Sequence, residues 1–118
     1  MRILICGDRN YTDAKQIYRW MKCLPKDTII IEGEAKGADT IAWVVADILG
    51  LAVERYPADW GSYGKAAGPR RNKQMLIEGK PDFVVWFHKN ITSSKGTANM
   101  ISQAEAAGIN VASGEISL

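Results

Sequence analysis

The chain has 118 residues, which is the size of one ordinary domain and is long enough to bury a core without a disulfide or metal. Its net charge of +2 is too small to indicate nucleic-acid or membrane binding through overall charge, so any basic site must be local. No apolar run reaches the roughly 18 residues of a membrane span, and no signal-peptide pattern is present. We expect a single cytoplasmic domain over residues 1–118.

Apolar runs that resemble buried strands alternate with segments whose apolar residues recur at helical spacing. This alternation predicts an α/β fold with a mainly parallel sheet of about five strands, covered by helices on both faces. The apolar faces of the second and fourth helices suit either the core or an interface. The expected strands are Arg2–Cys6, Thr28–Glu32, Ala52–Tyr56, Asp82–Phe87 and Ile109–Ala112, and the expected helices are Asp13–Leu24, Gly37–Leu49, Pro69–Glu78 and Gly96–Ala107.

The two cysteines and the one histidine form no metal or redox motif. Cys6 ends an apolar strand and Cys23 lies in a helical segment, without CxxC or Cys/His spacing. His88 marks the end of a strand, and we assign it no catalytic role. We expect no metal site and no cofactor, although Mg²⁺ could accompany a bound phosphate.

Four segments leave the carboxyl ends of the expected strands, where ligands bind in an open parallel sheet. They hold most of the glycines, together with the Arg and Asp residues that do not fit a helix face. The topology should therefore bring scattered residues onto one rim. The four segments are Gly7–Asp13, Gly33–Asp39, Pro57–Arg71 and His88–Thr97.

The third segment contains the strongest functional signal. A long Gly-rich connection leads to a helix start with Arg70 and Arg71 in the first turn, which favours a bound anion over a solvated loop. Trp60 and Tyr63 could stack on a nucleobase or pack the connection onto the domain.

The first two segments resemble backbone turns that approach a ligand. Gly7 allows a turn directly after a strand, and Arg9 could reach a phosphate or pair with a neighbouring Asp. In the second segment two glycines and small Ala35 flank a helix start with unpaired N–H groups. Asp39 there could bind a ribose hydroxyl or simply favour the helix dipole.

The fourth segment, SSKGT, offers either a phosphate cradle or an ordinary Ser/Thr helix cap. Ser93, Ser94, Gly96 and Thr97 supply its donors. Neither GxGxxG nor the P-loop pattern occurs, so a dinucleotide dehydrogenase or an ATPase is not indicated.

Five features in this order resemble the YspA-type branch of the SLOG superfamily, which is named for its DprA/Smf and Lonely-guy members. The resemblance extends from Arg2 to Val111, and its specific parts are the ADW and AGPxRN segments. It implies a Rossmann-like, three-layer α/β/α fold that binds nucleotides or nucleotide-derived ligands, often as a homo-oligomer. The features are Gly7–Arg9, GEAKGAD, PADW, YGKAAGPRRNKQM and KGTANM.

The Lonely-guy enzymes of that superfamily release a base from nucleoside 5′-monophosphates, and they resemble this chain at Arg71–Met75 and Gly96–Thr97. The likeness implies a phosphate or catalytic role for Arg71. Their essential Glu corresponds here to Met100, which cannot act as an acid or base. The chain also has Glu34 where the family often has a second Gly.

Three hypotheses follow. The first is a module that binds a nucleotide or nucleotide-derived signal without chemistry. The second is an enzyme that cleaves a nucleotide N-glycosidic bond, with Arg71 and Glu34 as catalytic candidates and Asp39 or Asp59 as other carboxylates. The third, ranked last, is binding of single-stranded DNA. The expected ligand-binding residues are Gly7, Arg9, Gly33, Ala35, Gly37, Asp39, Asp59, Trp60, Arg70, Arg71, Asn72, Gly96 and Thr97.

Overall fold

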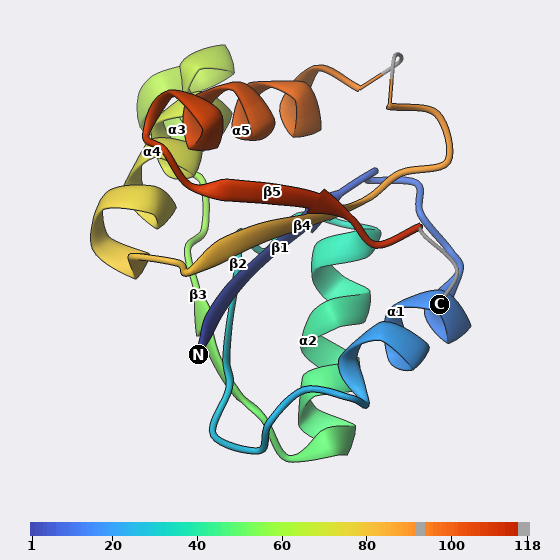
Figure 1. Ribbon diagram of the computed structural model, residues 1–118. Coiled ribbons are helices and arrows are strands. Elements are labelled where there is room, and N and C mark those ends of the chain that lie inside the picture. The colour runs from blue at the N-terminus through green and yellow to red at the C-terminus, as the bar shows by residue number, and fades with distance from the viewer. Residues whose placement is uncertain (92–93, 116–118) are drawn as a thin grey trace.

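Five parallel strands form one sheet in the order β3-β2-β1-β4-β5 in a computed structural model that describes residues 1–91 and 94–115 (Figure 1). The predicted α/β fold is therefore confirmed, and the sheet is parallel throughout. The strands are β1 (Arg2–Gly7), β2 (Ile29–Glu32), β3 (Ala52–Arg55), β4 (Phe83–Phe87) and β5 (Asn110–Ser113).

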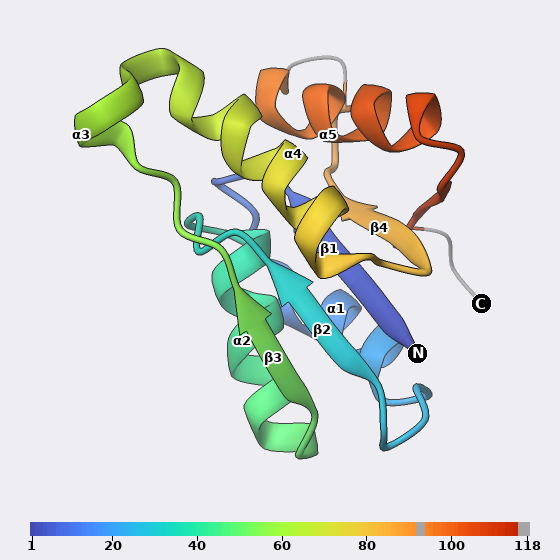
Figure 2. The same ribbon diagram turned by 90° about the vertical axis from the view of Figure 1, so that its left-hand side faces the viewer.

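Helices cover both faces of the sheet, which gives the expected three layers (Figures 1 and 2). Helices α1 and α2 pack together on one face, and α4 and α5 pack together on the other. The α-helices are α1 (Ala14–Met21), α2 (Ala38–Leu49), α3 (Trp60–Tyr63), α4 (Ala67–Gly79) and α5 (Lys95–Ala106), with a 3₁₀ turn at Gly64–Ala66. None of them is long and apolar enough to cross a membrane, within the part of the chain that the structure describes.

The central strand β1 is buried on both sides because its side chains alternate between two cores. Ile3 and Ile5 join the core under α1 and α2. Leu4 and Cys6 join the core under α4 and α5. This two-sided burial explains why the strand is an unbroken apolar run in the sequence.

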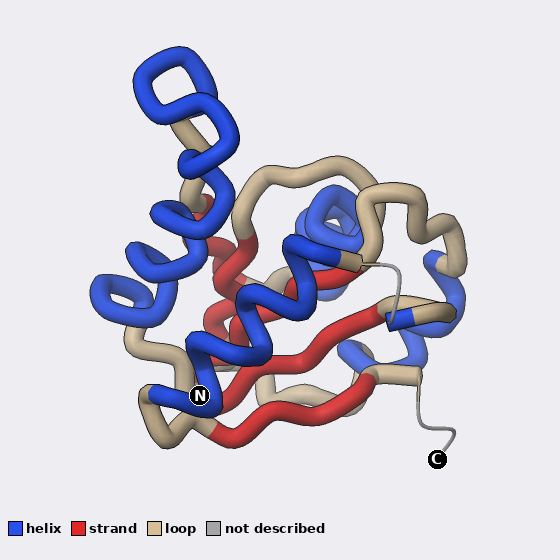
Figure 3. Tube along the Cα trace, turned by 90° about the horizontal axis from the view of Figure 1, so that it is seen from above, coloured by secondary structure: helices blue, strands red, loops and turns tan. Residues whose placement is uncertain are grey.

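The segment Pro57–Arg71 is more regular than expected. Asp59 caps the short helix α3 by accepting a hydrogen bond from the Ser62 N–H, at 3.1 Å. Helix α4 then begins at Ala67, two residues before the expected start at Pro69. A proline is tolerated in the first helical turn because the N–H groups there have no intrahelical partner. Seen from above, α3 lies at the outer end of the segment Pro57–Arg71, which we call the α3 extension (Figure 3).

The other boundaries agree with the expected ones to within about three residues. Helix α1 ends at Met21 rather than Leu24, and β5 begins at Asn110 rather than Ile109. Ile48, an apolar residue of the expected second helix Gly37–Leu49, is 68% exposed. The apolar face of α2 therefore does not belong entirely to the core.

The order of the strands fixes where a ligand can bind. From β1 the chain continues to β2 and β3 on one side of the sheet, and it later returns to place β4 on the other side of β1. The connections that leave β1 and β4 therefore diverge, which opens a crevice at the carboxyl ends of these two strands.

Candidate functional site

A cleft of about 1020 Å³ lies at the carboxyl ends of the strands. All four segments that leave those ends contribute to its walls, as the sequence predicted. The lining residues are Cys6, Gly7, Asp8, Arg9, Asn10, Glu34, Ala35, Lys36, Asp39, Trp60, Lys65, Gly68, Pro69, Arg71, Asn72, Met75, His88, Ser94, Lys95, Gly96, Thr97, Asn99 and Met100.

The first wall is the connection after β1, which is tied to two neighbours. The Asp8 N–H donates to the Phe87 carbonyl at 3.0 Å, and the Asp8 carbonyl accepts from the Ala38 N–H at 3.1 Å. Gly37 makes this approach possible, because its φ is +76° and an added Cβ would collide with the Asp8–Arg9 backbone. The connection thus holds Arg9 at the rim of the cleft.

The second wall is the turn Gly33–Gly37 between β2 and α2, and its first three amides already donate to carboxylates of the chain. One carboxylate oxygen of Asp39 accepts from the Gly33 N–H at 3.0 Å and from the Ala35 N–H at 3.3 Å. Glu32 accepts from the Glu34 N–H at 2.7 Å. The chain therefore supplies its own anions at a turn that we expected to approach a ligand.

Burial raises the pKa of both carboxyl groups, Asp39 and Glu32. Asp39 is 5% exposed and Glu32 is fully buried. Desolvation, with help from the nearby Glu32 charge, raises the pKa of Asp39 to about 7, against the opposing effect of Arg71. Desolvation also raises the pKa of Glu32, although its ion pair with Arg55 opposes the shift.

Glu34 differs from the other residues of the turn in its backbone conformation and in its ion pair. It has a φ of +56°, a left-handed conformation that is uncommon for a residue with a side chain. Its carboxylate lies 3.5 Å from Arg55, whose guanidinium stacks on Trp43 at 4.2 Å. Glu34 lines the cleft, but this ion pair ties its carboxylate to the β3 side of the turn.

The third wall is the start of α4, where two adjacent residues connect the other walls. Arg71 donates to the Gly33 carbonyl and, at 3.1 Å, to the side-chain oxygen of Asn72. The buried Asn72 amide in turn donates to Asn99 at 3.1 Å and to the Gly96 carbonyl at 3.4 Å. Arg71 and Asn72 therefore link the β2–α2 turn to the start of α5.

The fourth wall is the amino end of α5, and it retains free hydrogen-bonding capacity. Ser94 caps the helix by accepting from the Thr97 N–H at 3.1 Å. The Thr97 hydroxyl is buried and has no hydrogen-bond partner among residues 1–91 and 94–115. Gly96 is exposed in the first helical turn, where N–H groups have no intrahelical partner. Ser93, expected to contribute here, lies outside the described residues.

The floor of the cleft is apolar and rich in sulfur. Cys6, Met75 and Met100 line it, and each is less than 10% exposed. Burial raises the pKa of the Cys6 thiol well above its usual range, so the thiol stays neutral. The position that corresponds to the Lonely-guy glutamate thus belongs to this neutral floor.

The two aromatic residues of the α3 extension, Trp60 and Tyr63, have different surroundings. Trp60 is 59% exposed and lies at the rim of the cleft beside Gly68. Tyr63 is covered by the guanidinium of Arg70 at 4.2 Å, outside the cleft. Of these two aromatic side chains, Trp60 lines the cleft and Tyr63 does not.

The cleft gathers most of the residues that the sequence singled out, including both catalytic candidates. Gly33, Gly37, Asp59 and Arg70 do not line it; the first two shape its walls, and the last two act within the α3 extension. Sequence reasoning missed several lining residues, most of which lie in the four predicted segments beside named ones. The missed lining residues are Cys6, Asp8, Asn10, Lys36, Lys65, Gly68, Pro69, Met75, His88, Lys95, Asn99 and Met100.

His88 is one of these and is 5% exposed. Its Nδ1 accepts from the Asn90 N–H at 2.9 Å, and its Nε2 lies 3.9 Å from a carboxylate oxygen of Asp8. Its place at the end of a strand was evident from the sequence, whereas its burial against the β1 connection depends on the sheet order.

Comparisons with known proteins agree with this architecture. The sequence profile described as the YspA, cpYpsA-related SLOG family matches residues 1–63. The Gene 61 protein of Mycobacterium phage D29 is 32% identical, over 93% of this chain and 93% of that protein. DNA processing protein A (DprA) from Streptococcus pneumoniae has a similar fold, with a TM-score of 0.76 at 20% identity over 95% of this chain.

The chain spans only 49% of the length of that DprA structure, so the likeness concerns one part of the larger protein. The profile match covers more than half of the 118 residues, and the phage relative is similar along nearly its whole length. This chain belongs to the YspA, cpYpsA-related SLOG family.

Proposed function

We propose that this protein binds a nucleotide or a nucleotide-derived signalling ligand in the cleft at the carboxyl ends of its strands. One observation carries the proposal: the start of α5 combines a helix amino end with a buried Thr97 hydroxyl that lacks a partner. A ligand phosphate would accept hydrogen bonds from Gly96 and Thr97 there. Surrounding cations would add charge complementarity, namely Arg9, Lys36, Lys65, Arg71 and Lys95.

The rest of a nucleotide has a place in the same cleft. Trp60 offers an exposed aromatic face to a base, and the floor around Met75 and Met100 is apolar. Asp39 uses one carboxylate oxygen for two turn amides, which leaves the other for a ribose hydroxyl. Mg²⁺ would then enter only with the phosphate.

An N-glycosidic hydrolase is the second candidate. The observation in its favour is Asp39, a carboxyl in the cleft wall whose pKa of about 7 suits proton transfer near neutral pH. Glu34 is the other carboxylate of the wall, but it is paired with Arg55. We place binding first because Met100 puts a thioether where the related enzymes have a carboxylate.

Single-stranded DNA is the third candidate, and the fold of DNA processing protein A from S. pneumoniae lends it some support. Exposed Trp60 beside the cations of the rim would suit stacked bases and a phosphate backbone. Such binding would weaken steeply with salt, whereas a mononucleotide should show a shallow salt dependence.

The test mixes excess protein with a panel of trace nucleotides that includes cyclic and ADP-ribose-type species. Ultrafiltration separates bound from free material, and chromatography with mass detection identifies both fractions. We expect at least one nucleotide to be retained intact. Free base in the filtrate would favour the hydrolase, and retention of oligonucleotides alone would favour the DNA candidate.

A further inference from the structure

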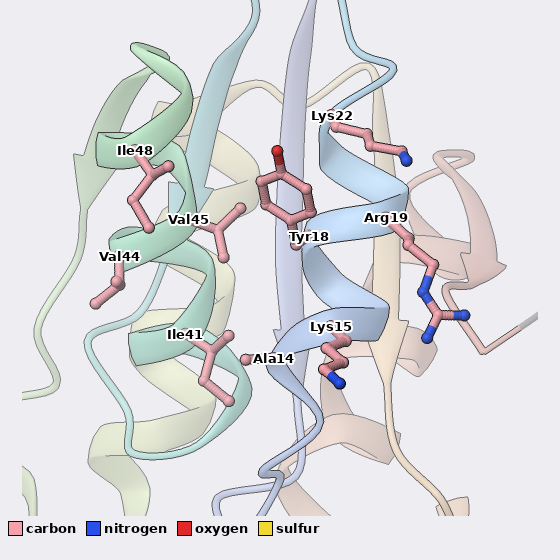
Figure 4. A pocket seen from close by; sticks show the side chains of 9 residues that line it. All are labelled: Ala14, Lys15, Tyr18, Arg19, Lys22, Ile41, Val44, Val45 and Ile48. Atoms are coloured by element: carbon pink, nitrogen blue, oxygen red, sulfur yellow. The ribbon is translucent and has the colours of Figure 1, made fainter.

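A second concave surface lies between α1 and α2, and none of its lining residues also lines the cleft. It is an open groove of about 470 Å³ (Figure 4). Its floor is apolar, with Tyr18 from α1 facing Val45 and Ile48 of α2 across the groove. The full lining is Ala14, Lys15, Tyr18, Arg19, Lys22, Ile41, Val44, Val45 and Ile48.

Three large apolar residues of the groove are exposed, although Val45 beside them is buried. Tyr18 is 41% exposed, Val44 is 47% exposed and Ile48 is 68% exposed. On α2 the groove residues recur at Ile41, Val44 or Val45, and Ile48, which is a stripe of two helical turns. Such a stripe on the surface is typical of a site that receives another helix.

The charges around the groove indicate which kind of helix fits. Lys15, Arg19 and Lys22 follow one another at spacings of four and three residues, so they share one flank of α1. None of the three makes an ion pair with any residue in 1–91 or 94–115. No acidic residue is among the described residues that line the groove.

The same charges argue against a second copy of this chain as the occupant. In a two-fold interface the groove meets the same groove of another copy, so its described lining would bring together two sets of three cations and no carboxylate to pair with them. A partner with acidic residues beside its apolar stripe would instead pair with all three.

We propose that the α1–α2 groove binds an amphipathic helix of another protein that carries acidic residues along one flank. Its apolar side chains, spaced three and four residues apart, enter between Tyr18 and Ile48, and its carboxylates lie against Lys15, Arg19 and Lys22. This inference concerns a different face from the nucleotide cleft and does not depend on the proposed ligand.

The test uses two fluorescein-labelled synthetic helical peptides of about 14 residues, roughly 21 Å long, with leucines at positions i, i+3 and i+7. One has Glu along the flank of the leucine stripe, and the matched peptide has Lys at the same positions. Fluorescence anisotropy should show saturable binding of the Glu peptide about tenfold tighter than of the Lys peptide, because three rim pairs each contribute a little.

Variants of the protein then test whether the peptides bind in the α1–α2 groove. Ile48→Asp changes a side chain that is 68% exposed, so the fold should persist by circular dichroism while binding of the Glu peptide falls about tenfold or more. Lys15→Glu combined with Arg19→Glu should reverse the preference between the peptides. Lys73→Glu, an exposed charge on α4, is the matched control and should leave peptide binding unchanged.

The proposal is overturned if the two peptides bind equally, if neither binds, or if Lys73→Glu weakens binding as much as Ile48→Asp. Light scattering tests the other possible occupant, a second copy of this chain. A wild-type dimer that Ile48→Asp converts to a monomer would mean that a second copy covers the groove, which contradicts the proposal. A wild type whose mass is unaffected by Ile48→Asp supports it.

Discussion

The two helix-starting turns of the cleft are similar in sequence but differ in what occupies them. The turn before α2 uses its Gly33, Glu34 and Ala35 amides to hold carboxylates of the chain itself. The turn before α5 leaves the Thr97 hydroxyl without a partner among the described residues, beside an exposed Gly96. A glycine-rich turn therefore indicates an anion site only when no nearby carboxylate already fills it.

The difference assigns distinct roles to the two turns. Gly33–Gly37 is a wall held by hydrogen bonds to buried Asp39 and Glu32 and by the Arg71 contact with Gly33. Ser94–Thr97 is the open position, where an incoming phosphate would complete unfinished hydrogen bonding. Four tests, taken from the largest expected effect to the smallest, probe this difference between the two turns.

The largest effect should come from matched glycine substitutions in the two turns. Gly37→Ala forces a side chain into a conformation with φ of +76° and against the Asp8–Arg9 backbone, so we expect a loss of about 3 kcal/mol in the free energy of unfolding. Gly96→Ala meets no atom within 4 Å and should change it by less than about 1 kcal/mol. Urea denaturation measures both, and equal losses would contradict the contrast.

Arg71→Ala should have the next largest effect, on ligand binding. It removes a cation from the cleft wall and the contact that ties Gly33 to α4. Charge-assisted hydrogen bonds are worth about 1.5–3 kcal/mol, so affinity for the retained nucleotide should fall about 10- to 100-fold. Arg70→Ala is the control, because Arg70 stacks on Tyr63 outside the cleft; calorimetry should find its affinity within about threefold of wild type. A larger loss in Arg70→Ala than in Arg71→Ala would place the phosphate elsewhere.

Thr97→Val should separate binding from stability. The substitution keeps the shape of the side chain and removes a hydroxyl that has no partner among the described residues, so the free energy of unfolding should stay equal or rise. Nucleotide affinity should fall about tenfold, which corresponds to about 1.4 kcal/mol for one hydrogen bond. Loss of stability with unchanged affinity would show that the hydroxyl serves the fold rather than a ligand.

The smallest effect concerns pH and Asp39. Burial raises the pKa of Asp39 to about 7, so the folded state holds a proton that the unfolded state releases near its ordinary pKa of about 3.9. This group therefore favours folding at low pH, and its contribution declines as the pH rises from about 4 to about 7. Ionised Asp39 should also repel an anionic ligand in the cleft.

Asp39→Asn removes that titration while keeping an oxygen for the turn amides. Compared with the variant, the wild type should lose both stability and nucleotide affinity, the latter by a few-fold, between pH 6 and pH 8. Titrating both proteins with one nucleotide at both pH values cancels the ionisation of the ligand phosphate. Parallel pH profiles for the two proteins would contradict the role of Asp39.

The layout of the sheet could be predicted because each element has its own signal. Buried strands such as Arg2–Gly7 are unbroken apolar runs, and parallel topology then places every strand-leaving segment at one edge. Arg9, Arg71 and Thr97 were therefore expected together in the cleft, and the structure places them there.

The partners of these residues could not be predicted, because they depend on distances across the fold. The sequence left Asp39 open between ribose and dipole, and its inward turn onto Gly33 and Ala35 became visible only in three dimensions. Helix α3 was missed because four residues capped by Asp59 are too short for a periodic pattern. The exposure of Ile48 depends on how α1 packs beside α2.

The most direct measurement is a titration of ¹⁵N-labelled protein with AMP, followed by amide chemical shifts. If the turn before α5 receives the phosphate, the largest shifts will be at Lys95, Gly96 and Thr97, where the Thr97 amide moves because its hydroxyl contacts the ligand although Ser94 holds its N–H. The amides of Gly33 and Ala35, which donate to Asp39, will move little. Dominant shifts at Gly33 and Ala35, or no saturable shifts in the cleft with any retained nucleotide, would contradict this account.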